Sequence, residues 1–166
     1  MQCFLSKGCD SRERLHFRSD QICGRWHFWG GSVKIVTFAC NWCSYAGADL
    51  AGVSRLKYPE DVKIVRVMCS GMVNPAWILR AFRQGADGVV IAGCHPGDCH
   101  YMVGNYYAKK RYLLLKELMK FIGFEDERLK LLWASASEGK KFAEEMSAFT
   151  KLVEQLGEQK QLRWER

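Results

Sequence analysis

The sequence predicts an α/β protein built on a small flavodoxin-like (Rossmann-like) parallel sheet. Two observations predict this class. Short apolar segments rich in β-branched residues alternate four times with longer segments that have helical periodicity. Strands that alternate with helices pair in parallel through right-handed crossovers. We therefore expect about four strands in the order 2-1-3-4 with flanking helices, within a chain of 166 residues that is long enough for one core.

The first predicted strand–helix unit extends from residue 33 to about Leu56. Residues 33–39 are β-branched and mostly apolar, as expected for a strand that is covered on both faces. After the turn at Cys40–Cys43, a helix rich in small residues is expected to continue to about Leu56. Small side chains would let its backbone approach the sheet or a cofactor closely, and Tyr58-Pro59 would end it.

The second unit begins with residues 62–68, which predict a strand that ends at Cys69. Asn74-Pro75 has the form of an N-cap followed by the first helical residue. Gly85 is expected to serve as the C-cap of this helix. The buried face of the helix is expected to consist of Ile78, Ala81 and Phe82.

The third unit contains the most apolar strand-like segment of the chain, residues 88–92, followed by a long amphipathic helix. Apolar residues spaced i, i+3, i+4 and i+7 predict its buried stripe as Leu115, Leu118, Met119 and Ile122. Gly123 is expected to end this helix.

The fourth unit begins with a predicted strand at residues 129–134. Ser135 or Ser137 is expected to cap a last helix, which Gly157 would end. The apolar face of that helix is expected to contain Phe142, Met146, Phe149, Val153 and Leu156.

We expect three parts along the chain: residues 1–32, the α/β domain at 33–157, and a polar C-terminal tail at 158–166. Residues 1–32 have no clear periodicity, and they contain the aromatic cluster Trp26-His27-Phe28-Trp29 before Gly30-Gly31-Ser32. This N-terminal extension is expected to be either disordered or a docking arm whose aromatic side chains bury on a partner.

Composition predicts a cytoplasmic globular protein without a membrane span. Apolar residues make up 48% and charged residues 26% of the chain, and no apolar run approaches the roughly 20 residues that a membrane span needs. No signal peptide is recognisable at the N-terminus. The net charge of +7 fits solubility or an acidic protein partner. No nucleic-acid-binding motif is present, and we expect Lys109-Lys110-Arg111 to be a solvated helix face.

Five of the eight cysteines follow three of the predicted strands. They are Cys40, Cys43, Cys69, Cys94 and Cys99. The carboxyl ends of parallel strands meet at one edge of an open sheet, where ligands bind, and neighbouring strands lie about 5 Å apart. Clustered thiols in a reducing compartment indicate metal or redox chemistry rather than a disulfide framework.

The spacing of these thiols favours an iron–sulfur cluster. Cys40 and Cys43 have two residues between them, and Cys94 and Cys99 have four, so two pairs could serve the two irons of a [2Fe–2S] cluster. Each cysteine turn opens a helix, whose free N–H groups favour negative charge. Pairing would leave Cys69 as the spare thiol, whereas the strand order would keep it and spare Cys43 or Cys99. Both assignments stay open.

Other interpretations of the thiols are a zinc site, a dithiol at Cys40–Cys43 like that of thioredoxin, and a cysteine nucleophile with His95 or His100 as its base. We expect these two histidines to hydrogen-bond backbone or cluster sulfur rather than to act as ligands. Trp42 and Tyr101 are expected to shield a cluster, to lie in an interface or to pack in the core.

Three segments in register resemble the delta (iron–sulfur) subunit family of methyl-viologen-reducing hydrogenase. They are Cys40-Asn41-Trp42-Cys43-Ser44-Tyr45-Ala46-Gly47-Ala48-Asp49, Arg66-Val67-Met68-Cys69-Ser70-Gly71, and Gly93-Cys94-His95-Pro96-Gly97-Asp98-Cys99-His100-Tyr101 with Gly104-Asn105 following. The resemblance covers about residues 33–156. The N-terminal residues 1–32 are not part of the family pattern.

The resemblance implies a [2Fe–2S] cluster that relays electrons from a hydrogenase, or a formate dehydrogenase, to the flavin-containing A-type component of heterodisulfide reductase. In methanogens (organisms that live by methanogenesis) this complex works by flavin-based electron bifurcation. The expected role is an electron-carrying subunit of an oxidoreductase complex, with no substrate site and no catalytic residues of its own. The alternative function is a zinc- or dithiol-based interaction or redox-regulatory module.

Overall fold

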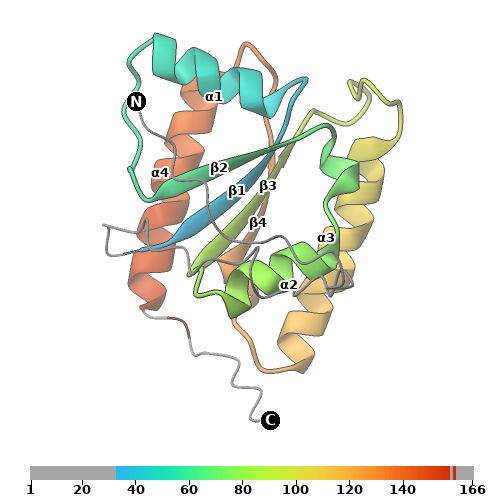
Figure 1. Cartoon of the computed structure of the whole chain (residues 1–166), viewed down its shortest axis with the longest axis vertical. Helices are drawn as coiled ribbons and strands as arrows, with labels where there is room; N and C mark the ends of the chain where they lie inside the picture. The colour runs from blue at the N-terminus through green and yellow to red at the C-terminus, as the bar shows by residue number, and fades with distance from the viewer. Residues whose placement is uncertain (1–32, 158, 160–166) are drawn as a thin grey trace, which may run out of the picture.

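A parallel sheet with the strand order β2-β1-β3-β4 forms the centre of the molecule, as the sequence predicted (Figure 1). The computed structural model describes residues 33–157 and residue 159. The expected N-terminal arm, and the tail apart from residue 159, lie outside the described residues. The strands are β1 (Ile35–Cys40), β2 (Val62–Val67), β3 (Gly88–Gly93) and β4 (Leu129–Trp133).

Helices cover both faces of this sheet. They are α1 (Ser44–Val53), α2 (Pro75–Arg83), α3 (Gly104–Phe121) and α4 (Gly139–Leu156), with 3-10 turns η1 (Ser70–Met72) and η2 (Asp126–Arg128). Side chains that alternate along β3 point to opposite faces. Val90 and Ala92 pack with α1 and α4, whereas Val89 and Ile91 pack with α2 and α3. The two cores therefore enclose β1 and β3, whose carboxyl ends lie side by side.

The ends of two helices follow the expected chemistry, with small differences. Asn74 caps α2, because its side-chain oxygen accepts the N–H of Ala76 at 2.9 Å. The C-cap of that helix is Gln84, one residue earlier than predicted, and Gly85 follows it at φ +93°. Helix α1 ends at Val53 rather than near Leu56, since the backbone turns left-handed soon after it, at φ +54°.

The predicted cap of α4 is wrong. The N-cap is Glu138, whereas the hydroxyls of Ser135 and Ser137 lie 3.1 Å from each other. Packing determines this start, because Gly139 comes so close to α1 that a Cβ there would lie 2.9 Å from the backbone nitrogen of Ala51. The backbone of α1 therefore decides where α4 begins.

The predicted stripe of α3 is only half right. Leu115 and Met119 are buried, but Leu118 and Ile122 are 43% and 41% exposed. The buried side of the helix instead continues through Ala108 to the first residue, Gly104. The buried side of α3 therefore differs from the predicted stripe, and several of its large apolar side chains face solvent.

Arg128 is a buried charge that the sequence did not predict, with 1% of its surface exposed. Its guanidinium pairs with Glu125 and donates to the carbonyls of Asp87 at 3.1 Å, Leu156 at 3.3 Å and Gly157 at 2.9 Å. These carbonyls include the C-terminal end of α4, whose last C=O groups have no helical partner. Arg128 therefore ties the end of α4 to the start of β3.

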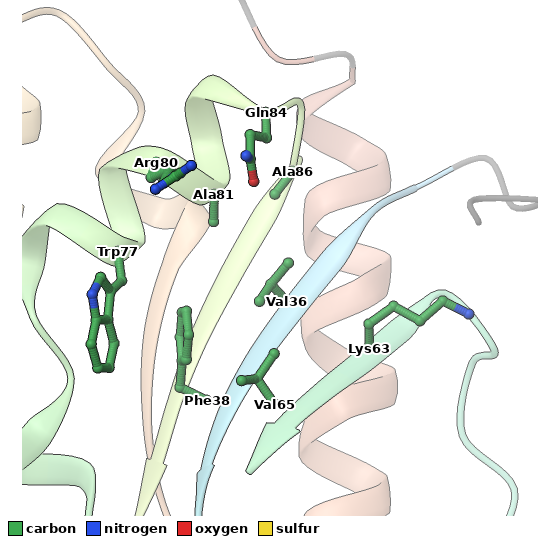
Figure 2. Close-up of a pocket in the computed structure, with 9 residues that line it drawn as sticks. All are labelled: Val36, Phe38, Lys63, Val65, Trp77, Arg80, Ala81, Gln84 and Ala86. Atoms are coloured by element: carbon green, nitrogen blue, oxygen red, sulfur yellow. The ribbon is translucent and has the colours of Figure 1, made fainter. Parts of the chain in front are cut away.

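An apolar pocket of about 220 Å³ lies between α2 and the edge of the sheet (Figure 2). Val36, Phe38, Val65 and Trp77 point into it from β1, β2 and α2. It forms because α2 and α3 cover β3 and β4 more fully than β1 and β2. Among the described helices, none combines the length and apolar composition that a membrane crossing needs.

Candidate metal centre

The five cysteine side chains that follow β1, β2 and β3 form one buried cluster at the carboxyl edge of the sheet. Each is at most 8% exposed. Pairing places Cys40 beside Val67, so the ends of β1 and β2 are in register, and β1 also pairs with β3 along its length. The strand order thus brings together thiols that are far apart in the sequence.

The turn between β1 and α1 contributes two of the thiols. Cys40 is the last residue of β1, and its Sγ lies 3.8 Å from the carbonyl oxygen of Met68. Cys43 is the N-cap of α1, and its Sγ lies 3.6 Å from Oγ of Ser44. Ser44 is itself held by donating to the carbonyl of Ala134 at 3.3 Å. The loop after β4 therefore positions Cys43 through Ser44.

Cys69 is the N-cap of η1, and its Sγ accepts the N–H of Gly71 at 3.4 Å. The same sulfur lies 3.9 Å from Sγ of Cys99. Gly104, the first residue of α3, lies against both: a Cβ there would be 2.2 Å from Sγ of Cys69 and 3.0 Å from Sγ of Cys99. The start of α3 therefore needs glycine to make room for sulfur.

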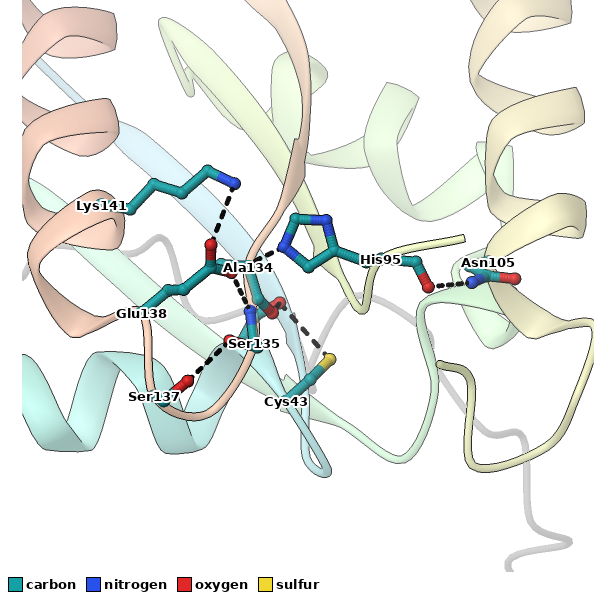
Figure 3. Close-up of polar contacts among 9 residues, drawn as sticks. Cys43, His95, Asn105, Ala134, Ser135, Ser137, Glu138 and Lys141 are labelled. Atoms are coloured by element: carbon teal, nitrogen blue, oxygen red, sulfur yellow. Dashed lines mark hydrogen bonds and ion pairs between the residues drawn. The ribbon is translucent and has the colours of Figure 1, made fainter. Parts of the chain in front are cut away.

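The turn between β3 and α3 contributes Cys94 and Cys99. Asn105 is buried and its Nδ2 donates to the carbonyl of His95 at 2.7 Å, which holds the two ends of the turn together. On the other side, Nε2 of His95 lies 2.6 Å from Oε2 of Glu138 (Figure 3). The turn that carries both thiols is thus bonded to α3 and to the loop before α4.

The histidines differ from expectation. His95 binds the Glu138 carboxylate instead of backbone or sulfur, because the loop after β4 approaches the end of β3. The imidazole of His100 stacks on Trp42, with ring centroids 3.9 Å apart and planes at 14°. Trp42 and Tyr101 are each 47% exposed, which excludes core packing for both. These exposed rings adjoin Cys43 and Cys99 in the sequence.

Protonation differs among the thiols. A hydrogen bond with Cys43 and burial raise the pKa of Cys40, and the same hydrogen bond lowers the pKa of Cys43. Burial raises the pKa of Cys69 above its usual value and raises the pKa of Cys94 to about 12. Burial by itself would raise the pKa of Cys99. Hydrogen bonds from backbone N–H groups, including two at the start of α3, outweigh burial and lower this pKa.

The five buried thiols are the type of ligand that holds iron–sulfur clusters. Within residues 33–157 and 159, no three Cys, His, Asp or Glu side chains converge closely enough to hold a single ion. Thiols in pairs, with N–H groups directed at two of the sulfurs, fit an anionic cluster of this kind.

Sequence reasoning missed the residues that support the thiols, which are Ser44, Gly104, Asn105 and Glu138. Three of them lie inside the quoted motifs, since Ser44 directly follows Cys43 and Gly104-Asn105 follow the turn of Cys99, so their positions near cysteine were a usable signal. Glu138 had no such signal, because it reaches His95 only through the fold.

A family model described as "Methyl-viologen-reducing hydrogenase, delta subunit" matches residues 35–157. Over 124 residues the chain is 52% identical to the iron-sulfur subunit of the F420-non-reducing hydrogenase vhc of Methanococcus voltae, covering 75% of this chain and 86% of that protein. It is 53% identical over 124 residues to the iron-sulfur subunit of the F420-non-reducing hydrogenase of Archaeoglobus profundus, covering 75% of this chain and 90% of that one.

A second kind of relative contains the matching residues within a much longer chain. The A-type component of the ferredoxin/F(420)H(2)-dependent CoB-CoM heterodisulfide reductase of Methanosarcina acetivorans is 51% identical over 123 residues, covering 74% of this chain. The match spans only 16% of that protein. In such relatives, the matching region is one part of a longer polypeptide.

Proposed function

The chain belongs to the methyl-viologen-reducing hydrogenase delta subunit family, and from this premise we propose that it is a one-electron carrier holding a [2Fe–2S] cluster. The observation that carries the proposal is the burial of five thiols from three strand ends in one cluster. When bound, the cluster would accept one electron from a donor protein and pass it to an acceptor protein.

Four of the five thiolates, Cys40, Cys43, Cys69, Cys94 and Cys99, would hold the cluster. Two ways of choosing the four ligands stay open. The natural pairs Cys40/Cys43 and Cys94/Cys99 would leave Cys69 as the spare thiol. The distance of 3.9 Å between Sγ of Cys69 and Sγ of Cys99 instead favours Cys69 as a ligand. The chain's N–H groups support negative charge at this edge: Gly71 donates to Cys69, and the start of α3 faces Cys99. Hydrogen bonds to sulfur and burial are the levers that set the potential of such a cluster.

Two features make the edge suitable for relay. The thiols are buried, so bulk water is largely excluded from them, and the exposed side chains Trp42, His100 and Tyr101 adjoin Cys43 and Cys99 in the sequence. An electron would cross the side chains at this edge to reach a partner. The chain contributes no substrate site in this role: its residues hold the cluster, adjust its potential and dock partners.

The relatives indicate the partners. Several are named as iron–sulfur subunits of hydrogenases, so we infer a hydrogenase as donor. A formate dehydrogenase as donor is the alternative that the family resemblance implies. Two others contain this region within an A-type component of heterodisulfide reductase, so we infer a flavoprotein of that type as acceptor. Fusion in one polypeptide supports direct contact between the two parts.

The test is anaerobic purification of the full chain followed by iron and sulfide assay, visible absorption, and EPR after reduction by dithionite. We expect about two irons and two sulfides for each chain. A signal from a single unpaired electron should appear on reduction. Colourless protein with zinc, or with a reversible disulfide at Cys40/Cys43, would overturn the proposal and favour the interaction or dithiol module.

The same assay identifies the spare thiol. Each of the five cysteines is changed to serine in turn, and the iron content is measured. We expect four variants to lose iron or to shift the spectrum, and one to keep both. Retention in Cys69→Ser would support ligation by the two natural pairs, whereas retention in Cys43→Ser or Cys99→Ser would place Cys69 among the ligands.

A further inference from the structure

Helix α3 carries a row of large apolar side chains that no described part of the chain covers. Its members are Tyr107, Leu114, Leu118 and Phe121, with exposed fractions of 53%, 70%, 43% and 88%. Positions seven apart lie almost two turns apart along a helix, so Tyr107, Leu114 and Phe121 share one strip, and Leu118 lies one turn beyond Leu114 on its edge. We call these four residues the α3 row.

The α3 row is separate from the side of the helix that packs on the sheet. That side contains Ala108, Leu115 and Met119, each at most 2% exposed. A surface helix of a globular protein needs one apolar face for its core. Helix α3 therefore has a second apolar strip whose burial the fold of this domain does not require.

Positive charge accompanies the row. Lys110 is exposed, and no carboxylate of the described residues pairs with it. Lys110 lies one turn before Leu114, on the edge of the row. The acidic side chain nearest the row in sequence, Glu117, is already paired with Lys120 at 3.2 Å. A complementary surface would therefore present apolar side chains flanked by carboxylates.

The N-terminal end of the helix that carries the α3 row lies against the thiol cluster. Helix α3 begins at Gly104, which lies against the sulfurs of Cys69 and Cys99. Just before it, Met102 and Val103 are 79% and 49% exposed, and they continue the apolar surface to the cysteine turn. A protein segment lying along α3 would thus bring the rest of its molecule next to the thiols.

We propose that the α3 row is the docking surface for an amphipathic helix with acidic flanks, and that this helix belongs to the heterodisulfide-reductase-A-type flavoprotein. The inference rests on the proposed function for the identity of that partner. Seven-residue spacing of exposed apolar residues matches a helix-on-helix contact. The relatives in which this region is fused to such a flavoprotein supply the reason to choose it.

Two other occupants are less favourable. A second copy of this chain would bring another net charge of +7 against the first. Binding to a membrane is less favourable because the row offers only four apolar residues, and the other side of the helix is buried in the core.

The test uses the full chain and the purified heterodisulfide-reductase-A-type flavoprotein from the same organism, with binding measured anaerobically. Leu114→Ser/Phe121→Ser removes the two most exposed members of the row. We expect its affinity to fall about tenfold or more. The matched control is Val53→Ser, an apolar residue 76% exposed on α1, and its affinity should equal that of the unchanged chain.

Charge is tested separately with Lys110→Gln. Exposed charges at the rim of an interface act mainly on association rate and salt dependence. We therefore expect slower association and a weaker dependence of binding on salt, with little change in dissociation. Unchanged rates at low salt would contradict acidic flanks on the partner.

Further outcomes distinguish the occupants. Equal binding by the row variant and the Val53→Ser control would overturn the proposal. So would row-dependent dimers in gel filtration, or row-dependent sedimentation with vesicles of anionic phospholipid. Iron is measured on the same samples: a chain without iron that still binds the flavoprotein through the row would keep this inference and overturn the electron carrier.

Discussion

At the scale of single residues, Gly104 leaves room for two of the sulfur atoms. Its missing side chain leaves the space that Sγ of Cys69 and Sγ of Cys99 occupy, at 2.2 Å and 3.0 Å from an added Cβ. Gly104→Ala is therefore expected to displace the thiols and to lower the iron content of the purified protein strongly. Iron assay and visible absorption measure this loss.

The matched control is Gly52→Ala, a second helical glycine, at which an added Cβ meets nothing within 4 Å. That variant should keep its full iron content. It should also unfold at slightly higher denaturant concentration, because alanine in a helix is favoured over glycine by about 1 kcal/mol. Full iron content in Gly104→Ala would contradict the close approach.

The carboxylate of Glu138 makes the stability of the folded protein depend on pH. The N–H of Ser135, at 2.7 Å, and the His95 ring lower the pKa of this carboxyl from 4.5 to about 2, and Lys141 lies 3.4 Å away. A lowered pKa means that the carboxylate stabilises the folded protein fully above pH 4.5. That contribution is lost as the pH falls from 4.5 toward about 2.

Glu138→Gln removes this titration and keeps the shape of the side chain. We expect the variant to be less stable than the unchanged chain at neutral pH, with a difference that shrinks as the pH falls through that range. Urea midpoints of both proteins at several pH values provide the measurement. A difference that stays constant with pH would show that charge on Glu138 contributes nothing.

At the scale of the secondary-structure element, α3 shows how far periodicity can be trusted. Leu118 and Met119 are neighbours in the predicted stripe, yet only Met119 is fully buried. Met119→Ala should reduce the free energy of unfolding by about 2–5 kcal/mol, because it leaves a cavity in the core. Leu118→Ala should cost less than about 1 kcal/mol, because its side chain faces solvent.

Urea denaturation of these two variants compares the same helix at adjacent positions. Similar losses for both would restore the stripe expected from the sequence and remove the basis for an exposed row. This difference in unfolding free energy between the two variants is expected for the isolated chain. Leu118 would gain its contacts only from a bound partner.

At the scale of the whole molecule, the cluster edge and the sheet should differ in how much they depend on iron. All residues of β3 and five of the six in β1 are buried, whereas the cysteine turns lie at the edge. Because a metal group that binds only the folded state stabilises it, removing iron with a chelator should lower the unfolding temperature.

Hydrogen exchange locates that loss. We expect faster amide exchange in the turns at residues 40–43, 69–72 and 94–103 after iron removal, with protection retained at the centres of β1 and β3. Uniform loss of protection through the sheet would instead mean that the fold itself depends on the cluster.

The sequence by itself determined the alternation of strands and helices, the strand order, and the convergence of the five cysteines. These follow from short-range patterns. β-branched apolar runs indicate buried parallel strands, and right-handed crossovers then leave few possible orders. Once the order is known, a cysteine at the end of β1, β2 or β3 must lie at the same edge. Residues such as Cys40 and Cys94 were thus predictable without coordinates.

Only the tertiary structure decided which neighbour each side chain meets. The start of α4 depends on the close approach of Gly139 to α1, and the partner of His95 is a carboxylate that lies 43 residues away along the chain. The buried guanidinium of Arg128 is satisfied by carbonyls just before β3 and at the end of α4. Such contacts join segments distant in sequence, so no local pattern of residues carries them, and packing alone selects them.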